Sequence, residues 1–523
     1  MVKAWMHRAA PLLVGGALVL AAPSTHVAAA TFTVAAGGDL QGALNSAQPG
    51  DTVELEGGAT FVGNFVLSLK AGKDGVITVR SAQNPALPPA GTRVQPSHAP
   101  MLAKLRSPNT QPALQTAPGT HHWHLELLEF EANRGGAGDI ITLGDGSTAQ
   151  TSLTQVPHDL VVDRCYVHGD PSVGQKRGIA LNSASTTISG SYISEIKAIG
   201  QDTQAIMGWN GPGPYTISNN YLEAAGENLL FGGADPSIPN LVPSDVTISG
   251  NTLSRPVSWR GQRWQIKNIL ELKNARRVTI TGNLLENNWL AAQVGFAVLF
   301  TVRNQDGRCP WCQVEDVLFE RNRVQHSAGG VSILGVDDTG PSRQTKSIVI
   351  RNNLFADIDN EHWGGNGYFL LLTGAPRDIV VDHNTIIQEH AYGIVQVEGP
   401  PILGFVFTNN LVRHNAYGII GQDRAPGSDT ISAFFPAALV TSNVIADGDA
   451  GRYPLGNRFP SSAEFRRQFV AYDQSDFRLS PTSAWNTAGM DGAAVGADLS
   501  AAAGRPRTPM LPRPPVPKSG RPR

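Results

Sequence analysis

The chain has 523 residues, a formal net charge of −2 and 16% charged residues, where soluble domains average about 25%. So small a net charge argues against a nucleic-acid partner and gives no strong field for an acidic polymer, so any polyanion site must be local. The 56 glycines and 36 prolines indicate many turns.

Residues 1–30 have the composition of a secretory signal peptide. Lys3 and Arg8 provide positive charge, residues 11–22 are apolar, and Ala28-Ala29-Ala30 forms a small-residue cleavage site. The apolar run is too short for a membrane span, and no later segment is long and apolar enough for one. No cysteine lies near the cleavage site, as a bacterial lipoprotein would require. We therefore expect a secreted or periplasmic protein, with a retained anchor as the alternative.

Residues 31–500 are expected to form one domain that opens with a short helix. Apolar residues recur with helical spacing from Leu40 to Ala47, and Pro49-Gly50 ends the pattern. Alternating apolar residues then indicate strands from Val53 to Phe130, with a proline-rich loop at residues 85–100.

A short strand phrase that ends in a turn and an asparagine recurs along the chain. In one copy, Val278-Thr279-Ile280 alternates apolar and polar residues before Thr281-Gly282-Asn283. The same asparagine is found at Asn220, Asn251, Asn283, Asn322, Asn353, Asn384, Asn410 and Asn443, and Cys165 and Ser191 take its place in looser copies. The spacings lie between 26 and 39 residues, and such a period indicates a solenoid, a propeller or an array.

Each copy offers three short strands, whereas a propeller blade needs four strands in about 40 residues or more. Three strands per repeat predict a parallel β-helix, in which each strand pairs with its equivalent one coil away. The asparagine suits a tight bend because it tolerates left-handed torsion angles, and stacked asparagines can hydrogen-bond each other as a ladder. An all-β sandwich, the alternative, has no reason to keep so regular a repeat.

On these residues the sequence resembles the right-handed parallel β-helix superfamily of pectate-lyase-like proteins, over roughly residues 37–498. The resemblance implies an all-β fold: a single solenoid of about 11 or more coils. We expect the helix near Leu40 to cap the first coil, because an uncapped end exposes apolar core and unpaired strand edges.

Two segments follow the repeats. Residues 473–498 lack the asparagine phrase and resemble the closing segment of bacterial β-helix proteins. Residues 501–523 are rich in proline and arginine, which predicts a disordered or polyproline-like tail. The tail is either a simple solubilising end or a contact for an acidic surface.

Charged residues on neighbouring strands suggest a chemistry. If Leu270 and Leu272 face the core, Glu271 and Lys273 point to solvent, and Arg303 takes the same face one coil later. A lysine beside an arginine has its ammonium form disfavoured and can act as a base nearer neutral pH. The alternative is a surface ion pair between Glu271 and Lys273, which is worth little.

This arrangement is similar to the family of chondroitinase B and alginate lyases, which has a lysine on one such strand and an arginine on the next. The resemblance implies Lys273 as base and Arg303 as acid or carboxylate clamp in β-elimination of a uronic polysaccharide. That family places two calcium-binding glutamates shortly before the lysine. Here those positions are Ile266 and Asn268, with Glu271 the nearest carboxylate, so the sequence leaves calcium as a possible cofactor and requires none.

Other residues near these strands are candidates for binding substrate. Asn228 and Asp235 belong to the preceding coil, and Asp235 is placed to bind a cation or a sugar hydroxyl. Trp209, next to Asn210, could stack on a pyranose ring. A turn-capping aspartate and a wall aromatic without a ligand are the alternatives.

The three cysteines and a histidine tract suggest structure more than catalysis. Cys309 and Cys312 form a CxxC in a long loop without the βαβ context of thioredoxins, and we expect them to form a disulfide in an exported protein. Cys165, at a ladder position, is expected to be a buried free thiol. The tract His121-His122-Trp123-His124 resembles a metal-binding run, but we expect it at a sheet edge.

The sequence therefore predicts an exported carbohydrate-active protein, with a polysaccharide lyase as the first hypothesis. The alternatives are a non-catalytic glycan-binding scaffold and a glycoside hydrolase. The hydrolase rests on Asp337 and Asp338, although hydrolases need two carboxylates across the bond and adjacent strand residues point to opposite sides. We expect a polysaccharide partner, no nucleic acid, no membrane span and a monomer.

Overall fold

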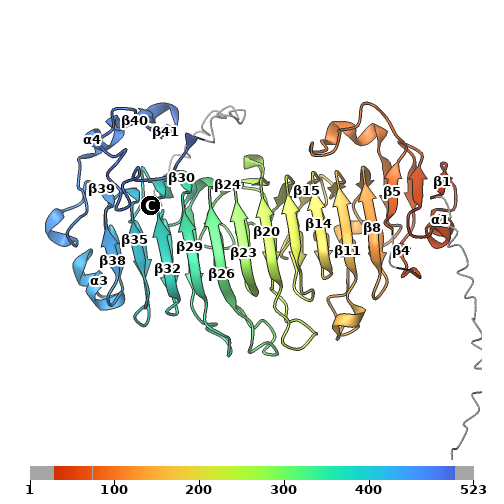
Figure 1. Cartoon of the computed structure of the whole chain (residues 1–523), viewed down its shortest axis with the longest axis horizontal. Helices are drawn as coiled ribbons and strands as arrows, with labels where there is room; N and C mark the ends of the chain where they lie inside the picture. Colours follow the sequence, from red (N-terminus) through yellow and green to blue (C-terminus); the bar gives the residue numbers. More distant parts are fainter. Residues whose placement is uncertain (1–28, 73–74, 501–523) are drawn as a thin grey trace, which may run out of the picture.

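The repeated phrases fold into stacked coils. The computed structural model describes residues 29–72 and 75–500, so most of the predicted signal peptide and the whole predicted tail lie outside the described residues. Three long parallel sheets, here called A, B and C, form a right-handed parallel β-helix (Figure 1). The prediction of a β-helix with about 11 or more coils is confirmed, since sheet A has 14 strands.

Sheet A contains the strand of each phrase. Its strands are β1 (Thr31–Val34), β2 (Thr52–Leu55), β5 (Ile77–Ser81), β8 (His121–Glu126), β11 (His158–Asp163), β14 (Ala184–Ser189), β17 (Tyr215–Ser218), β20 (Ser244–Ser249), β23 (Ala275–Thr281), β26 (Val314–Glu320), β29 (Lys346–Arg351), β32 (Arg377–Asp382), β35 (Val406–Thr408) and β38 (Leu439–Thr441).

Sheet B follows the asparagine. Its strands are β3 (Thr60–Val62), β6 (Ala103–Arg106), β9 (Leu128–Phe130), β12 (Tyr166–His168), β15 (Tyr192–Ile196), β18 (Tyr221–Ala224), β21 (Thr252–Ser254), β24 (Leu284–Asn288), β27 (Arg323–Ser327), β30 (Leu354–Ile358), β33 (Thr385–Ile387), β36 (Leu411–Arg413) and β39 (Val444–Ala446).

Sheet C completes each coil before the chain returns to sheet A. Its strands are β4 (Phe65–Leu67), β7 (Leu114–Thr116), β10 (Asp139–Leu143), β13 (Arg177–Leu181), β16 (Gln204–Gly208), β19 (Glu227–Phe231), β22 (Leu270–Leu272), β25 (Phe296–Thr301), β28 (Gly329–Leu334), β31 (Leu370–Thr373), β34 (Val395–Val397) and β37 (Ile419–Gly421).

The remaining elements are short. They are the α-helices α1 (Leu40–Ser46), α2 (Asn360–Trp363), α3 (Ser428–Phe434) and α4 (Ser462–Arg467), the antiparallel pair β40 (Phe469–Ala471) and β41 (Asp476–Leu479), and the 3-10 helices η1 (Pro96–Met101), η2 (Arg134–Gly136), η3 (Leu153–Gln155), η4 (Val257–Trp259), η5 (Ala450–Arg452) and η6 (Tyr472–Gln474). No helix among the described residues is both long and apolar enough to cross a bilayer.

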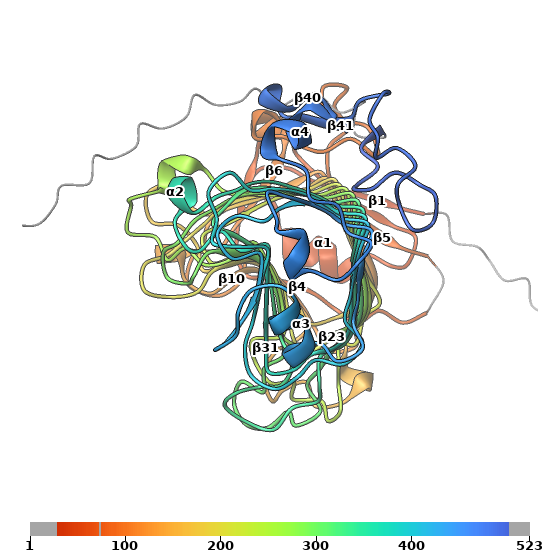
Figure 2. The ribbon, with the colours of Figure 1, turned by 90° about the vertical axis from the view of Figure 1, so that its left-hand side faces the viewer.

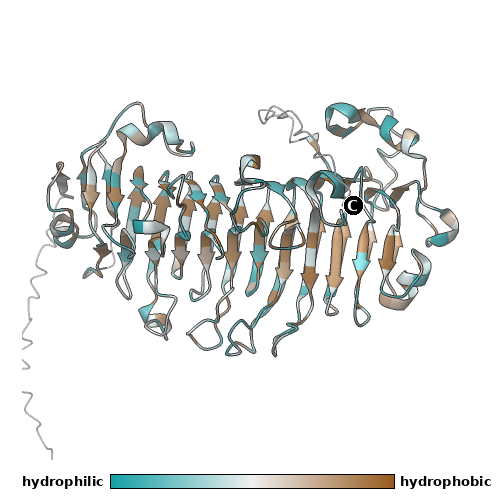
Figure 3. Cartoon of the chain, turned by 180° about the vertical axis from the view of Figure 1, so that it is seen from behind, coloured by the Kyte–Doolittle hydropathy of each residue, from teal (hydrophilic) through white to brown (hydrophobic). Residues whose placement is uncertain are grey.

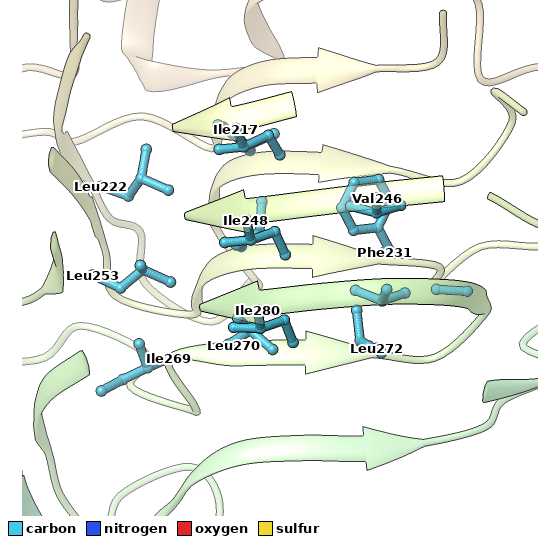
Figure 4. Close-up of a cluster of buried hydrophobic side chains, with 14 of the residues drawn as sticks. Ile217, Leu222, Phe231, Val246, Ile248, Leu253, Ile269, Leu270, Leu272 and Ile280 are labelled. Atoms are coloured by element: carbon cyan, nitrogen blue, oxygen red, sulfur yellow. The ribbon is translucent and has the colours of Figure 1, made fainter. Parts of the chain in front are cut away.

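The core is built from the inward residues of all three sheets. Equivalent side chains stack from coil to coil, as Ile217, Ile248 and Ile280 do in register (Figure 4). Each is fully buried, and burying such a side chain contributes about 1.5–3 kcal/mol. In Figure 3 most strands are brown, whereas teal gathers in the turns and at isolated strand positions. Strand alternation therefore sets which residues enter the core.

The asparagines form the predicted ladder at the turn between sheets A and B. Asn322 donates from Nδ2 to Asn353 Oδ1 at 3.2 Å and accepts from Asn283 Nδ2 at 2.9 Å, and the pattern continues from Asn220 to Asn443. At the other end Cys165 N donates to Ser191 Oγ at 3.0 Å. Cys165 is a buried free thiol, as expected, and burial raises its pKa to about 12.

One detail of the ladder prediction was wrong. The left-handed torsion angle belongs to the residue before the asparagine, such as Asn219 (φ 55°), Arg321 (φ 53°) or His383 (φ 51°). The asparagine side chain is then free to point inward, where its amide can reach the next coil. Each turn therefore uses two successive residues: the first adopts the left-handed torsion angle, and the second is the asparagine whose amide joins the ladder.

Helices cover both ends of the solenoid. Leu40 and Leu44 of α1 join the core beneath the first coil, and Asp39 caps α1 by accepting from Gly42 N at 2.8 Å. At the other end Ile431 and Phe434 of α3 cover the last coil. The segment 473–498 does not close this end of the solenoid. It packs, together with α4 and β40, along the outer face of sheet B (Figure 1). There Val495 and Phe469 share a hydrophobic cluster with sheet B side chains.

Candidate active site on the outer face of sheet C

Strand stacking brings distant polar residues together on the outer face of sheet C. Asp139, Arg177, Gln204 and Glu227 pair in register from β10 to β19. Glu271 on β22 lies outside this row, because it pairs with Leu230. Loops project beside this sheet on both sides in Figure 2, which looks along the solenoid with β10 and β31 on the sheet between them. We call this surface the sheet C face.

The first residues of this row are joined by hydrogen bonds. Arg177 donates to Asp139 Oδ1 at 2.8 Å and, from Nε and a second nitrogen, to Gln204 Oε1 at 3.1 and 3.0 Å. Gln204 Nε2 donates to Glu227 Oε2 at 2.9 Å. A continuous polar network therefore crosses four coils. Sequence reasoning missed Arg177 and Gln204, although both stand at the start of a sheet C strand.

Glu227 is the most perturbed carboxyl of the sheet C face. Its side chain is 1% exposed, and burial, together with the negative charge of Glu271, raises its pKa to about 7. Lys267 Nζ lies 3.7 Å from Glu227 Oε1 and also pairs with Asp202. Burial lowers the pKa of Lys267, but Glu227 and Asp202 outweigh it and raise the pKa above its ordinary value. Lys267 therefore stays positively charged beside a carboxyl that titrates near neutrality.

Glu271 and Lys273 differ in their exposure. The Glu271 side chain is 2% exposed and accepts from Asn268 Nδ2 at 3.1 Å and from Thr301 Oγ1 at 3.0 Å. Lys273 is 17% exposed, and its Nζ lies 3.6 Å from Glu271 Oε1. The expectation that both charges point to solvent is therefore wrong for Glu271, because neighbouring coils cover it. Lys273 keeps access to solvent.

Arg303 has partners that the sequence did not indicate. Its guanidinium donates to Asp337 Oδ1 at 2.7 Å and to Asp338 Oδ1 at 2.6 Å. Its backbone N donates to Lys273 O at 3.0 Å, so the two residues are neighbours on adjacent coils. Burial raises the pKa of Asp337, but hydrogen bonds from Thr339 and Asn304 and the charge of Arg303 bring it below its ordinary value. Asp338, with 68% of its side chain exposed, is the more accessible of the two carboxylates that contact the arginine, since the side chain of Asp337 is fully buried.

Three of the predicted substrate-binding residues lie inside the protein. Asn228 is fully buried and donates to Leu222 O and Ser254 O, each at 2.7 Å. Asn210 is also fully buried, with its amide bonded to loop backbone. Asp235 is 3% exposed and accepts from the backbone nitrogens of residues 306 and 308 at 3.1 and 2.8 Å. These contacts fix loops and leave little side chain for a ligand.

The loop that Asp235 holds contains the two paired cysteines. Cys309 and Cys312 form a disulfide with an S–S distance of 2.09 Å. Trp311 between them donates from its indole to Leu241 O at 3.1 Å. The loop is thus a fixed wall beside sheet C.

Trp209 lines a cavity on the sheet C face. The cavity has a volume of about 380 Å³ and is also lined by Asp139, Lys176 and Arg177. Arg177 lies over the indole ring at 5.2 Å from its centroid. An aromatic face next to cations and carboxylates can stack on a sugar ring and bind its hydroxyl or carboxylate groups. A second cavity of about 320 Å³ lies farther along the same face, at Gln396, Glu398 and Gln422.

A cation would find hard ligands beside Glu227. Glu227 Oε1 and Asn268 Oδ1 are buried oxygens without a hydrogen-bond partner, and their strands are adjacent, since Asn228 N donates to Ile269 O at 3.0 Å. Carboxylate and amide oxygens are the ligands that Ca²⁺ prefers. These two oxygens are of the type that calcium prefers but are too few to complete its coordination, and the Lys267 ammonium already supplies positive charge at this place.

Comparison with known proteins supports the fold. No protein-family model and no curated protein matches the chain. Among solved structures it is similar to the PL6 family alginate lyase AlyGC, with a TM-score of 0.50 and 14% identity over 89% of this chain and 58% of the lyase. The chain also matches a GH87 alpha-1,3-glucanase from Streptomyces thermodiastaticus, with a TM-score of 0.47 and 13% identity over 82% of this chain and 70% of the glucanase. It matches the Dettilon tailspike protein with a TM-score of 0.43 and 12% identity over 72% of this chain and 62% of the tailspike. The chain spans little more than half of the alginate lyase.

Proposed function

We propose that this protein is an exported, carbohydrate-active β-helix enzyme, a polysaccharide lyase that binds a uronic-acid-containing glycan along the sheet C face and cleaves it by β-elimination. The observation that carries the proposal is the position of Lys273. It is a partly exposed amine beside Arg303, on a face where Arg177 and Arg303 are each held by carboxylates. The similarity to an alginate lyase supports the same substrate class.

β-Elimination needs a base for the proton α to the uronate carboxylate and a positive group for that carboxylate. Lys273 is the proposed base. Its separation from Glu271, 3.6 Å, exceeds a good hydrogen bond, and the Asn268 and Thr301 donors already satisfy the glutamate oxygens. Both Glu271 oxygens are therefore bonded by other donors, while the Lys273 amine keeps its access to solvent.

Arg303 is the proposed carboxylate clamp. A uronate carboxylate has the charge and geometry of Asp338, so it can replace that exposed side chain on the guanidinium while Asp337 keeps the arginine in place. Calcium, if bound, would be held by the partnerless oxygens of Glu227 and Asn268 and would neutralise the substrate carboxylate. Trp209 and Arg177 would then bind a sugar unit farther along the face.

The test is formation of unsaturated uronate from pectate, alginate and glycosaminoglycans, measured by ultraviolet absorbance with calcium or with chelator. Wild type should produce absorbance, and Lys273→Ala should lower the rate by about 10²–10⁴-fold, as expected for loss of a general base. The matched control is Lys346→Ala. Lys346 lies on sheet A, away from the sheet C face, and forms an ion pair with Glu315. An equal rate in wild type and Lys273→Ala would remove Lys273 from the mechanism.

Two other functions are tied to particular observations. The cavity at Trp209 would also serve a glycan-binding scaffold without catalysis, and this function predicts binding on a glycan array with no product. Glu227, with its pKa near 7, has the protonation of a general acid for glycoside hydrolysis, which predicts new reducing ends without ultraviolet absorbance.

A further inference from the structure

We propose that Asp357, Asp359 and His362 form a binding site for a divalent transition metal of the zinc class at the turn between sheets B and C. Among the described residues, they are the group of histidine and carboxylate side chains whose ligand atoms all lie within 4.8 Å of one another. Asp357 lies on β30, Asp359 caps α2 and His362 lies within α2. Figure 2 shows α2 projecting from the side of the solenoid.

The distances at His362 are also those expected around a metal ion. Its Nδ1 makes a long hydrogen bond of 3.3 Å to Asp357 Oδ1 and lies 3.4 Å from Asp359 Oδ2. Other histidines of the chain bond carboxylates more closely, as His383 does with Asp382 at 2.8 Å. Bonds of about 2.1 Å to a tetrahedral zinc place its ligands about 3.4 Å apart. His362 therefore stands from both carboxylates at the separation of zinc ligands.

Further side chains orient the two carboxylates. His326 Nδ1 lies 2.8 Å from Asp357 Oδ2, and the Trp363 indole donates to the same oxygen at 2.9 Å. His390 Nδ1 lies 2.8 Å from Asp359 Oδ2. Metal sites commonly hold their ligands through such outer hydrogen bonds. Because His326, Asp357 and His390 belong to successive coils, the site is specified by stacking.

Access and ligand type define the class of metal. The His362 and Asp357 side chains are 30% and 31% exposed, so an ion can enter, whereas Asp359 is fully buried and fixed by two α2 backbone nitrogens at 2.8 Å. An imidazole with carboxylates suits Zn²⁺ and related first-row ions, whereas Ca²⁺ takes oxygen ligands only. The bound ion would tie α2 to β30.

The metal site also contacts the segment that leads into β22 beside the sheet C face. Trp363 of α2 packs in a cluster with Trp264 and Ile266, and its carbonyl accepts from Leu290 N at 2.9 Å. Lys267 and Asn268 follow directly in the chain, so metal binding at α2 would stiffen the segment that carries them.

The test is zinc binding to the full chain after chelator treatment, by isothermal titration calorimetry, with the visible spectrum of Co²⁺ as a second readout. Wild type should bind one equivalent. His362→Gln should bind more than ~100-fold more weakly, and His326→Gln about 10–100-fold more weakly, as for loss of an outer partner. The control His122→Gln changes the other histidine group, in which the His121 and His158 rings stack at 5.0 Å, and should bind like wild type.

His362→Gln must keep the wild-type circular dichroism and metal-free melting curve; if it does not, Asp357→Asn replaces it with the same expected loss. Absence of zinc binding and Co²⁺ bands in wild type would overturn the proposal. So would equal binding by His362→Gln, or loss of the zinc in His122→Gln instead.

Discussion

At the scale of residues, burial makes Glu227 a pH-sensitive group. Its pKa of about 7 in the folded protein exceeds the ordinary value of 4.5, so the folded chain holds a proton that the unfolded chain has released. The free energy of unfolding should therefore fall as pH rises from about 4.5 to 7, by on the order of 3 kcal/mol for this group. The contribution is complete below the unfolded pKa and absent above the folded pKa.

Glu227→Gln should abolish this part of the pH dependence, because glutamine does not titrate and can still accept from Gln204. Urea unfolding of wild type and variant at pH 5 and pH 8 measures the difference. The control Glu464→Gln changes an exposed residue of α4 and should keep the wild-type profile. Parallel pH profiles for wild type and Glu227→Gln would show that the Glu227 carboxyl is ionised in the fold throughout this range.

At the scale of elements, the ladder should be a main source of stability for the turns. Asn322→Ala removes the acceptor for the Asn283 backbone and side-chain nitrogens, both at 2.9 Å, and two donor contacts of its own. We expect a loss of about 2–4 kcal/mol, since buried polar groups are left unpaired. Asn322→Ser should lose less, because Ser191 already fills a ladder position and accepts from a backbone nitrogen.

Denaturant unfolding and hydrogen exchange of the neighbouring coils measure this loss. Asn366→Ala, at an exposed asparagine outside the ladder, is the control and should stay within about 0.5 kcal/mol of wild type. An Asn322→Ala variant as stable as the control would mean that strand pairing alone holds the turns.

At the scale of the whole molecule, the caps should keep the solenoid from associating end to end. Leu44 on α1 is 1% exposed and packs against the first coil, so Leu44→Asp should loosen α1 and expose apolar core and strand edges. We expect a monomeric wild type and concentration-dependent oligomers of the variant in light scattering after size exclusion. Asn45→Asp, an exposed change on the same helix, should remain monomeric. Oligomers formed equally by both variants would reject a specific role for the buried face.

The sequence by itself determined the coil, its ladder and its first cap. These features follow from local patterns, namely strand alternation, the recurring asparagine and the apolar periodicity of Leu40–Ala47. Repetition makes the strand pattern easier to recognise, because each strand pairs with the equivalent strand of the next coil. Even the buried thiol at Cys165 follows from its place in the repeat. The predicted position of the left-handed residue was wrong by one, since two neighbouring residues share the demands of the turn.

Only the tertiary structure decided which polar residues meet. Coil lengths differ through their insertions, so sequence spacing does not show that Arg303 reaches Asp337 and Asp338, or that coils cover Glu271 while leaving Lys273 partly open. Stacking likewise unites His326 and Asp357 from separate coils. The positions of strands and turns depend on local sequence, whereas the burial and the partners of a charged side chain depend on which residues of neighbouring coils and loops cover it.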